Sequence, residues 1–451
     1  MAGGTWTLGV EKVRPGLYMN FKTAALERIR SGERGTVTMP LALNWGEPQT
    51  FLRIEKDSDA MELLGYDIND EELLLVREAK KRAKTLLVYR LNGGARATAS
   101  FGTAPNATTA TAKHPGTRGN DIRITAEDDP SSENGMLVKT LVAGRVVDQQ
   151  VVTAAEQLKA NAWVTFAGTG AVAATPGAAL AGGTNAAVVG ADHTEYLERT
   201  ETQHFEVIAY PYEDAELKTS FVSYIRRMRE EEGKKIQGVI AGSFSNGVFQ
   251  NVSDYEGIVS VGNGVVLQGG AALTKEQAVA WVAGATAGAS IVQTNTYSAY
   301  EGAADANPRL KNSQVIDALK RGQFVFVHDG VKVKVEQDIN SLTTYSQTRN
   351  GRFSKNRVVR VLDAIANDFA RVANDSYIGK IDNNADGHAL LKAAANQYLR
   401  DLQDAGAIQN VDFDRDFEID KARSVGDEVY VNLAVQPVDS MEKFFFTVEV
   451  R

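Results

Sequence analysis

FEVIAYPYEDAELKTSFVSYIRRMREEEGKKIQGVIA, residues 205–241, contains the pattern that decides the fold of this chain. Two short apolar runs, Phe205–Ala209 and Ile236–Ala241, have the length and composition of buried strands. The apolar residues between them recur every three to four positions, as on one face of a helix: Leu217, Phe221, Tyr224, Ile225 and Met228. A strand, a helix and a second strand in this order predict a parallel sheet with a crossover helix.

The sequence on the C-terminal side of this unit continues the same pattern. Gly257–Val261 predicts another strand, and Thr274 followed by Gln277 matches the capping box that opens a helix. Asp329-Gly330 lies between two β-rich runs, which is a strong signal for a hairpin. Residues 204–336 are therefore predicted to form an α/β domain.

The flanking regions differ from this domain in composition. Residues 95–191 are rich in Ala, Thr and Gly, and their short alternating stretches between turn signals predict a small all-β module. Gly168–Gly183, of low complexity, is either a flexible segment leaving this module or a loop inside it. Residues 345–451 contain two amphipathic helical patterns, followed by three β-prone stretches: Asp412–Ile419, Glu428–Val435 and Phe444–Val450.

Composition and charge exclude whole classes of function. At 451 residues the chain is too long for one core, so several domains are expected. The 49 Lys and Arg against 57 Asp and Glu give a net charge of −8, which argues against binding a nucleic-acid backbone. No run is long enough to span a membrane and no signal-peptide pattern opens the chain, so a soluble protein is expected. The absence of Cys removes disulfides and thiolate chemistry, and fits a reducing compartment.

Motifs for catalysis are incomplete. In Gly242-Ser-Phe-Ser-Asn-Gly247 and Gly257-Ile-Val-Ser-Val-Gly262 one residue too many separates the first glycine from the candidate serine of a hydrolase elbow. The five histidines are scattered, without a pair at metal-binding spacing. We therefore predict no catalytic residue and no cofactor.

Two acidic stretches have some features of calcium loops. Asp382–Gly387 begins like one but has Ala393 where a glutamate should complete it, which favours a helix N-cap turn at Asp386. Asp412–Asp420 carries acids at alternate positions, which favours a strand with one solvated or partner-facing acidic face. We predict no metal site.

Both ends of the chain are β-prone. Thr5–Val10 and Phe444–Val450 lie where chains usually fray, and an unpaired apolar strand promotes aggregation. Each strand either pairs inside its own domain or completes the sheet of a neighbour. The residues alone favour the first alternative.

Seven stretches in a fixed order resemble the contractile tail sheath proteins of phages and phage-derived bacteriocins, most of all those of Gram-positive hosts. They are Val13–Tyr18 with Asn20-Phe21, Gly116–Ile122, Trp281–Gly288, Val335–Thr343, Phe353–Val359, Tyr377–Lys380 and Val435–Lys443. Together they run from one end of the chain to the other, so the resemblance concerns the whole protein.

The resemblance implies an α+β multidomain fold with a β-sandwich insertion, a subtilisin-like α/β domain without a catalytic triad, and an α/β C-terminal domain with exchanged terminal strands. Its segments are expected as follows: an N-terminal arm at 1–22, a segment at 23–92 that packs with the inner domain, the sandwich at 93–186, the subtilisin-like domain at 187–344, and a tube-facing domain at 345–451 that ends in a C-terminal arm.

The resemblance also reverses the expectation for the two ends. In such sheaths the terminal arms add strands to neighbouring subunits, which assigns the subunit interface to Thr5, Trp6, Thr7, Leu8, Val10, Phe444, Phe445, Phe446, Val448 and Val450. The implied function is a structural, non-enzymatic protomer that polymerises as stacked rings and contracts, driving a tail tube through the target cell envelope. The rival hypotheses are an α/β hydrolase and a surface adhesin or binding module.

The implied partners are further copies of the chain, the tail tube protein, and baseplate and tail terminator proteins. No nucleic acid and no membrane insertion are implied. The particle would be a virion tail or a bacteriocin, assembled in the cytoplasm of the host bacterium. The residues expected to face the tube are basic positions on the two C-terminal helical patterns: Arg357, Arg360 and Arg371 on the first, and Lys392 and Arg400 on the second, Asp386 to Ala405.

Overall fold

The computed structural model describes residues 2–4, 16–18, 29, 34–103, 107–132, 134–245, 248–251 and 253–451. The chain divides into two compact units. The first unit combines Met1–Gly32 with Ala364–Val438, and the second combines Glu33–Asp363 with Asp439–Arg451. None of the helices in the described ranges has both the length and the apolar composition that crossing a membrane requires.

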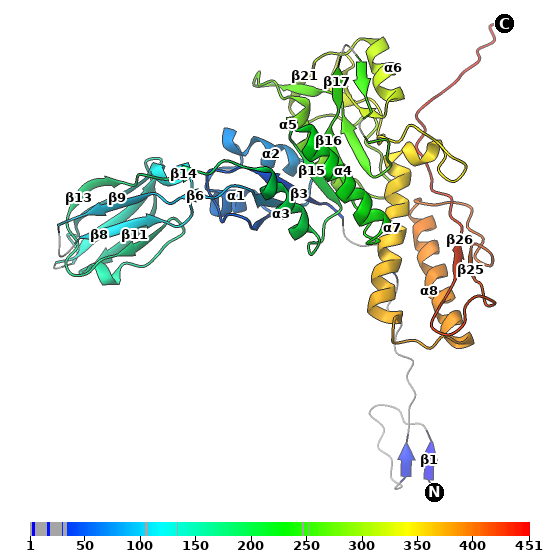
Figure 1. Ribbon diagram of the computed structural model, residues 1–451, viewed down its shortest axis with the longest axis horizontal. Coiled ribbons are helices and arrows are strands. Elements are labelled where there is room, and N and C mark those ends of the chain that lie inside the picture. The colour runs from blue at the N-terminus through cyan, green and yellow to red at the C-terminus, as the bar shows by residue number, and fades with distance from the viewer. Residues whose placement is uncertain are drawn as a thin grey trace. The chain divides into compact units, whose positions relative to one another are not determined.

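A seven-stranded sheet forms the centre of the second unit (Figure 1). In spatial order its strands are β22 (Gln323–Phe324), β19 (Ile258–Val261), β16 (Gln237–Ala241), β15 (Val207–Tyr210), β3 (Thr36–Leu41), β5 (Thr85–Arg90) and β4 (Phe51–Ile54). Neighbouring strands are parallel, except that β4 is antiparallel to β5. The predicted strand–helix–strand unit is confirmed as β15, α4 (Ala215–Glu230) and β16.

The sheet also contains part of residues 23–92, the segment predicted to pack with the inner, C-terminal domain. Within the described part of this segment, β3, β5 and β4 are strands of the central sheet, and Val37 of β3 pairs with Val207 of β15. Parallel pairing joins strands that are far apart in the chain. Local apolar patterns do not show which strands pair across such a separation.

Helices cover both faces of the sheet. On β15, Val207 and Ala209 point into one buried cluster, and Ile208 and Tyr210 into another, because successive side chains of a strand alternate. The helices of the first cluster are α1 (Asp57–Leu64), α2 (Leu74–Lys80) and α5 (Lys275–Gly288), and those of the second are α3 (Gly190–Thr200) and α4. Burial on both faces explains why the strands are continuous apolar runs.

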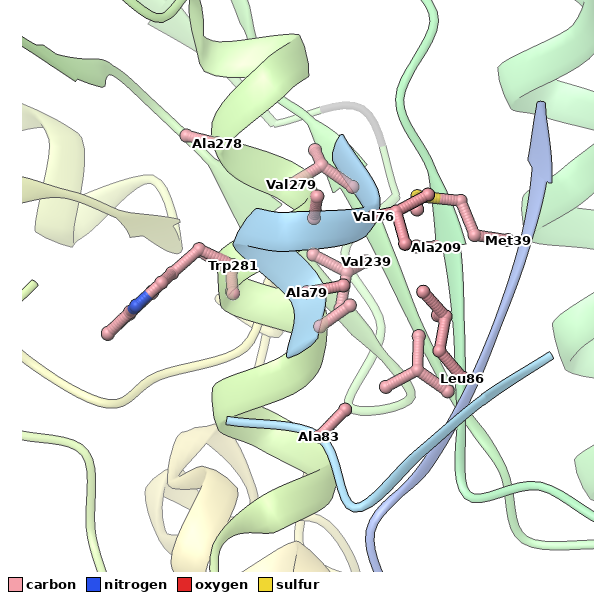
Figure 2. Packing of buried hydrophobic residues seen from close by; sticks show 14 of the residues in the cluster. Met39, Val76, Ala79, Ala83, Leu86, Ala209, Val239, Ala278, Val279 and Trp281 are labelled. Carbon is pink, nitrogen blue, oxygen red and sulfur yellow. The ribbon is translucent and has the colours of Figure 1, made fainter. Parts of the chain in front are cut away.

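Helix α5 is buried along most of its length, from Ala278 to Ala287. Figure 2 shows it crossed by α2, with Val76 and Ala79 at the packed surface. A Cβ on Gly284 would lie 2.3 Å from the carbonyl oxygen of Ala79, so glycine permits this close approach. The predicted capping box is confirmed, since Gln277 N donates to Thr274 Oγ1 at 3.3 Å and Thr274 N donates to Gln277 Oε1 at 3.0 Å.

Residues 94–185 form the predicted all-β module, a sandwich of two antiparallel sheets. One sheet contains β11 (Arg145–Val152), β10 (Met136–Val142), β9 (Ile122–Asp128) and β13 (Thr175–Ala179), and the other contains β12 (Val164–Ala167), β8 (Thr108–Ala112) and β7 (Thr98–Phe101). Strand β13 comes from Gly168–Gly183, so this segment belongs to the module. Trp45, from the loop after β3, lies in the sandwich core beside Trp163, with ring centroids 5.1 Å apart. The chain enters through β6 (Gly94–Ala95) and leaves through its partner β14 (Thr184–Asn185).

The remaining elements of the second unit are small. They include the hairpin of β17 (Ser243–Ser245) and β18 (Val248–Gln250), the pair β20 (Gly264–Leu267) and β21 (Ala303–Asn307), helix α6 (Asn312–Lys320), and the hairpin of β23 (Phe326–His328) and β24 (Val333–Val335). The last of these confirms the hairpin predicted at Asp329-Gly330.

The described part of the first unit contains helical segments, an antiparallel hairpin and a short parallel strand pair. Its elements are the part of α7 (Asn356–Val372) from Ala364 onward, a π-helical turn (Ala373–Tyr377), α8 (Ala385–Asp404), the antiparallel strands β25 (Phe417–Ile419) and β26 (Val431–Leu433), and the parallel strands β1 (Ala2–Gly4) and β2 (Gly16–Tyr18). The ring of Phe369 on α7 lies 5.6 Å from that of Tyr398 on α8 and 6.1 Å from that of Phe417 on β25. These rings join the helices to the hairpin.

Local hydrogen bonding corrects two predictions in the C-terminal region. Residues 412–416 form a turn rather than an acidic strand face, because Asp412 N donates to Asp416 Oδ2 at 2.7 Å and Asp414 N donates to Asp412 Oδ1 at 3.1 Å. The N-cap of α8 is Asn384, which accepts from the backbone N–H of Gly387, rather than Asp386. The segment Phe444–Val450 has no regular secondary structure in the isolated chain, so its predicted pairing with a neighbouring subunit stays a prediction.

Candidate functional site

The C-terminal segment after Met441 exposes an unusual amount of apolar surface. The exposed fractions are 64% for Phe444, 90% for Phe445, 83% for Phe446, 81% for Val448 and 91% for Val450. Phe444 and Phe446 stack with centroids 6.3 Å apart and ring planes at 6°, as alternate residues of an extended chain do. Contiguous exposed apolar surface of this kind marks an interaction site.

The hairpin of β25 and β26 has room for further strands. Phe417 and Ile419 of β25 are buried, whereas all three residues of β26 are exposed. Val429, Val431 and Leu433 are exposed at alternate positions, and β26 has no second partner strand among the described residues. A sheet of two strands is marginal in water, and an open edge accepts the backbone of another segment.

The predicted N-terminal interface residues, Thr5 to Val10, lie outside the described residues. The described residues nearest to them are the parallel strands β1 and β2, on either side of that segment in the chain. The N-terminal arm therefore stays a prediction.

The predicted basic face of α7 is wrong at Arg360. Its side chain is fully buried, lies 3.6 Å from the carboxylate of Asp338 and donates Nη1 to the carbonyl oxygen of Gln293 at 2.7 Å. The helical period separates the two sides of α7, but it does not show that the polar side is buried as well. Arg360 cannot meet a partner in this arrangement.

The other two arginines of α7 are more accessible. Arg357 is partly exposed. The side chain of Arg371 is 47% exposed and lies 3.4 Å from Asp368. Both side chains keep some accessible surface, so both residues remain candidates for facing a partner.

The basic residues of α8 contact the turn that follows the helix. Lys392 Nζ donates to the carbonyl oxygen of Asp414 at 2.9 Å, and the guanidinium of Arg400 lies 4.4 Å from the ring centre of Phe413. Lys392 also borders a groove of 710 Å³ between α8 and the hairpin. Charged groups of both signs line this groove, among them Glu418, Asp420 and Lys421. A surface with mixed charges suits contact with another protein better than binding of a single ion.

The structure does not place the candidate serines in a hydrolase site. Ser243 and Ser245 belong to a hairpin strand, whereas a hydrolase nucleophile occupies a turn from a strand to a helix. Ser260 of β19 is buried and donates to Gln323 Oε1 at 3.1 Å. Within the described ranges, no group of His, Asp or Glu side chains has the arrangement of a metal site.

The fold and the exposed segment together define a class of protein: a multidomain α/β chain with an inserted β-sandwich and an exposed apolar C-terminal segment. Comparisons with known families agree along the chain. The matches are the tail sheath protein Gp18 domain III N-terminal region at 34–91, the phage tail sheath protein β-sandwich domain at 92–185, the phage tail sheath protein central domain at 186–341 and the phage tail sheath C-terminal domain at 348–451. The chain belongs to the phage tail sheath protein family, which confirms the resemblance found in the sequence.

Individual relatives support this assignment. The chain is 42% identical to the phage-like element PBSX protein XkdK of Bacillus subtilis (strain 168), over 100% of both chains. A sheath tail protein from Desulfitobacterium hafniense, known from a crystal structure, is 44% identical to this chain in sequence. The two structures superimpose with a TM-score of 0.84, over 95% of this chain and 98% of the other chain. The contracted helical sheath of the anti-feeding prophage, at 12% identity and a TM-score of 0.56, covers 97% of this chain and 99% of its own and shares the fold.

Proposed function

We propose that this chain is the protomer of a contractile tail sheath, a structural protein that polymerises as stacked rings around a tail tube. Contraction of the polymer would drive the tube through a target cell envelope, and the chain itself would carry no catalysis. The particle would be a virion tail or a bacteriocin assembled in the cytoplasm of the host. Its partners would be further copies of the chain, the tube protein, and baseplate and tail terminator proteins.

The observation that carries this proposal is the exposed C-terminal segment. Phe445 and Val450 are each about nine-tenths exposed in the single chain, although burying such side chains stabilises a fold by about 1.5–3 kcal/mol each. Polymerisation supplies the missing partner. The segment Phe444–Val450 would pair with the open edge of the β25–β26 hairpin of a neighbouring subunit, where Val431 and Leu433 are exposed.

The N-terminal segment would act in the same way. Thr5–Val10 would add a strand to a neighbour, so that each subunit would be linked through both ends. The segment boundaries at 22, 92, 186 and 344, and a subtilisin-like origin of the central domain, belong to this proposal. Arg357, Arg371, Lys392 and Arg400 would face the tube, where weak ion pairs can be released as the sheath contracts.

Negative-stain electron microscopy of the purified full chain tests the proposal. Hollow tubes or rings are expected, and chains without residues 1–20 or without 443–451 should remain folded but fail to form them. Monodisperse monomers of the full chain at high concentration would contradict the sheath assignment. Tubes formed by either truncated chain would contradict the role of that arm.

A further inference from the structure

Three stretches that carry the family resemblance meet at one polar cluster in the second unit: Val335–Thr343, Phe353–Val359 and Val435–Lys443. The residue of the third stretch in this cluster is Glu442, whose side chain is 10% exposed. Its Oε1 accepts a hydrogen bond from Thr296 Oγ1 at 2.7 Å, and its Oε2 accepts one from Gln337 Nε2, also at 2.7 Å. Lys355 Nζ forms an ion pair with the same Oε2. One carboxylate thus binds three separate parts of the chain.

The charge of Glu442 is well compensated. Burial by itself raises its pKa, but the hydrogen bonds from Gln337, Lys355 and Thr296 outweigh this effect, and the pKa of Glu442 lies below its ordinary value. The carboxylate therefore stays ionised at neutral pH. An ionised carboxylate binds its donors more strongly than a neutral one, which makes this contact a firm attachment.

The same cluster holds the start of α7. Asp338 accepts from Asn295 N at 2.9 Å and from Asn356 Nδ2 at 2.8 Å, and it faces the guanidinium of Arg360. Asn340 Nδ2 donates to the carbonyl oxygen of Phe353 at 2.8 Å, just before the helix. The segment beside Gln337 therefore binds Glu442 on one side and the first turns of α7 on the other.

Hydrogen bonding and burial of the chain both decrease abruptly on the C-terminal side of Glu442. Val438 is still bonded to the first unit through the carbonyl oxygen of Ala407, at 2.9 Å, and Glu442 is held in the second unit. From Phe444 onward the apolar side chains are exposed. Glu442 is thus the last strongly bonded residue before the exposed segment.

We propose that Glu442 anchors the root of the terminal segment to the second unit, so that Lys443–Arg451 extends from a fixed point. At roughly 3.3 Å per residue the free segment reaches about 30 Å from this point. The consequence for assembly rests on the proposed sheath function. A neighbour that pulls on Phe444–Val450 would therefore transmit the force through Glu442 to Gln337, Lys355 and the start of α7. The force would not pass to the β25–β26 hairpin of the same chain.

Spin-label distance measurements on the unpolymerised full chain test the anchor. The sequence has no cysteine, so Lys443→Cys and Ile316→Cys, the latter 45% exposed on helix α6, provide two unique labels within one unit. In the doubly labelled chain, the distance between the two labels is expected to have a narrow distribution. Adding Glu442→Ala should broaden that distribution, because it removes the anchor. Glu449→Gln is the matched control, because it removes an exposed carboxylate from the same segment and should leave the distribution unchanged.

A second variant removes hydrogen-bond donors to Glu442 and leaves Glu442 itself unchanged. Thr296→Val combined with Gln337→Leu deletes two donors without changing the terminal segment, and it should broaden the distribution as Glu442→Ala does. A distribution that stays narrow in both variants, or one that is already broad without them, would overturn the anchor. These distances do not depend on polymerisation, so a chain that never forms tubes would contradict the sheath function and leave the anchor intact.

Discussion

Helix α5 and the C-terminal segment are two strongly apolar stretches of this chain, and they have opposite environments. From Ala278 to Ala287 every side chain of α5 is buried, between α2 and the strands of the central sheet (Figure 2). From Phe444 to Val450 the apolar side chains are exposed. The same physical tendency to leave water is satisfied within one chain in the first case and remains unsatisfied in the second.

This difference means that one apolar stretch acts in folding of the single chain and the other is available for assembly between chains. Helix α5 completes the core of the second unit, so its side chains determine whether the subunit folds. The terminal segment contributes little burial to the single chain, so its side chains are available to a partner. Substitutions in the two stretches should therefore affect different measurements.

The largest expected effect on stability comes from Trp281→Ala. Trp281 is fully buried, stacks on Tyr300 with ring centroids 4.5 Å apart and donates Nε1 to Glu301 Oε2 at 2.8 Å. Its removal leaves a cavity and should lower the free energy of unfolding by about 3–5 kcal/mol, as measured by urea denaturation. Phe445→Ala removes an aromatic ring of the terminal segment and is the control, with an expected change below about 0.5 kcal/mol. Equal losses in both variants would show that the segment is part of the folded core.

A smaller effect is expected from Gly284→Ala on the same helix. The added methyl group would lie 2.3 Å from the carbonyl oxygen of Ala79 and would push α2 away from α5, at a cost of about 1–3 kcal/mol. The control is Gly269→Ala, because no atom lies within 4 Å of the position of that added carbon. A Gly284→Ala chain as stable as the control would mean that the two helices do not pack as closely as the structure shows.

The sequence was sufficient where local pattern decides the outcome. The unit of β15, α4 and β16, the capping box at Thr274 and the hairpin at Asp329-Gly330 each depend on residues close together in the chain, and all three were predicted. The placement of β3, β5 and β4 in the central sheet was missed, because it depends on pairing between distant segments. The turn at 412–416 was missed because aspartate side chains bond the backbone there, which an alternating pattern does not reveal.

The candidate site shows the same limit. The apolar composition of Phe444–Val450 drew attention to that segment, but its exposure could not be derived from composition. The helical period predicted Arg360 on an exposed basic surface of α7. In the structure that side of the helix is also covered at this position, and Arg360 is buried beside Asp338. The anchor at Glu442 was also missed, since its donors Thr296, Gln337 and Lys355 come from three different stretches. The motifs Val335–Thr343, Phe353–Val359 and Val435–Lys443 contain or lie close to these residues. They indicated the protein family, but they did not indicate the contact of Glu442 with its donors.

The smallest expected effect on folding belongs to the combined variant Phe444→Ser, Phe445→Ser and Phe446→Ser. These rings are exposed in the single chain, so the free energy of unfolding should change by less than about 0.5 kcal/mol. Tube formation should nevertheless be lost, because the variant removes apolar surface that would be buried between subunits. The control is Val146→Ser on β11, which removes an apolar side chain that is 52% exposed elsewhere on the second unit and should leave tubes intact. If the triple variant forms tubes as readily as the control, exposure of the segment has no role in assembly, and the contrast with α5 would describe only a frayed end.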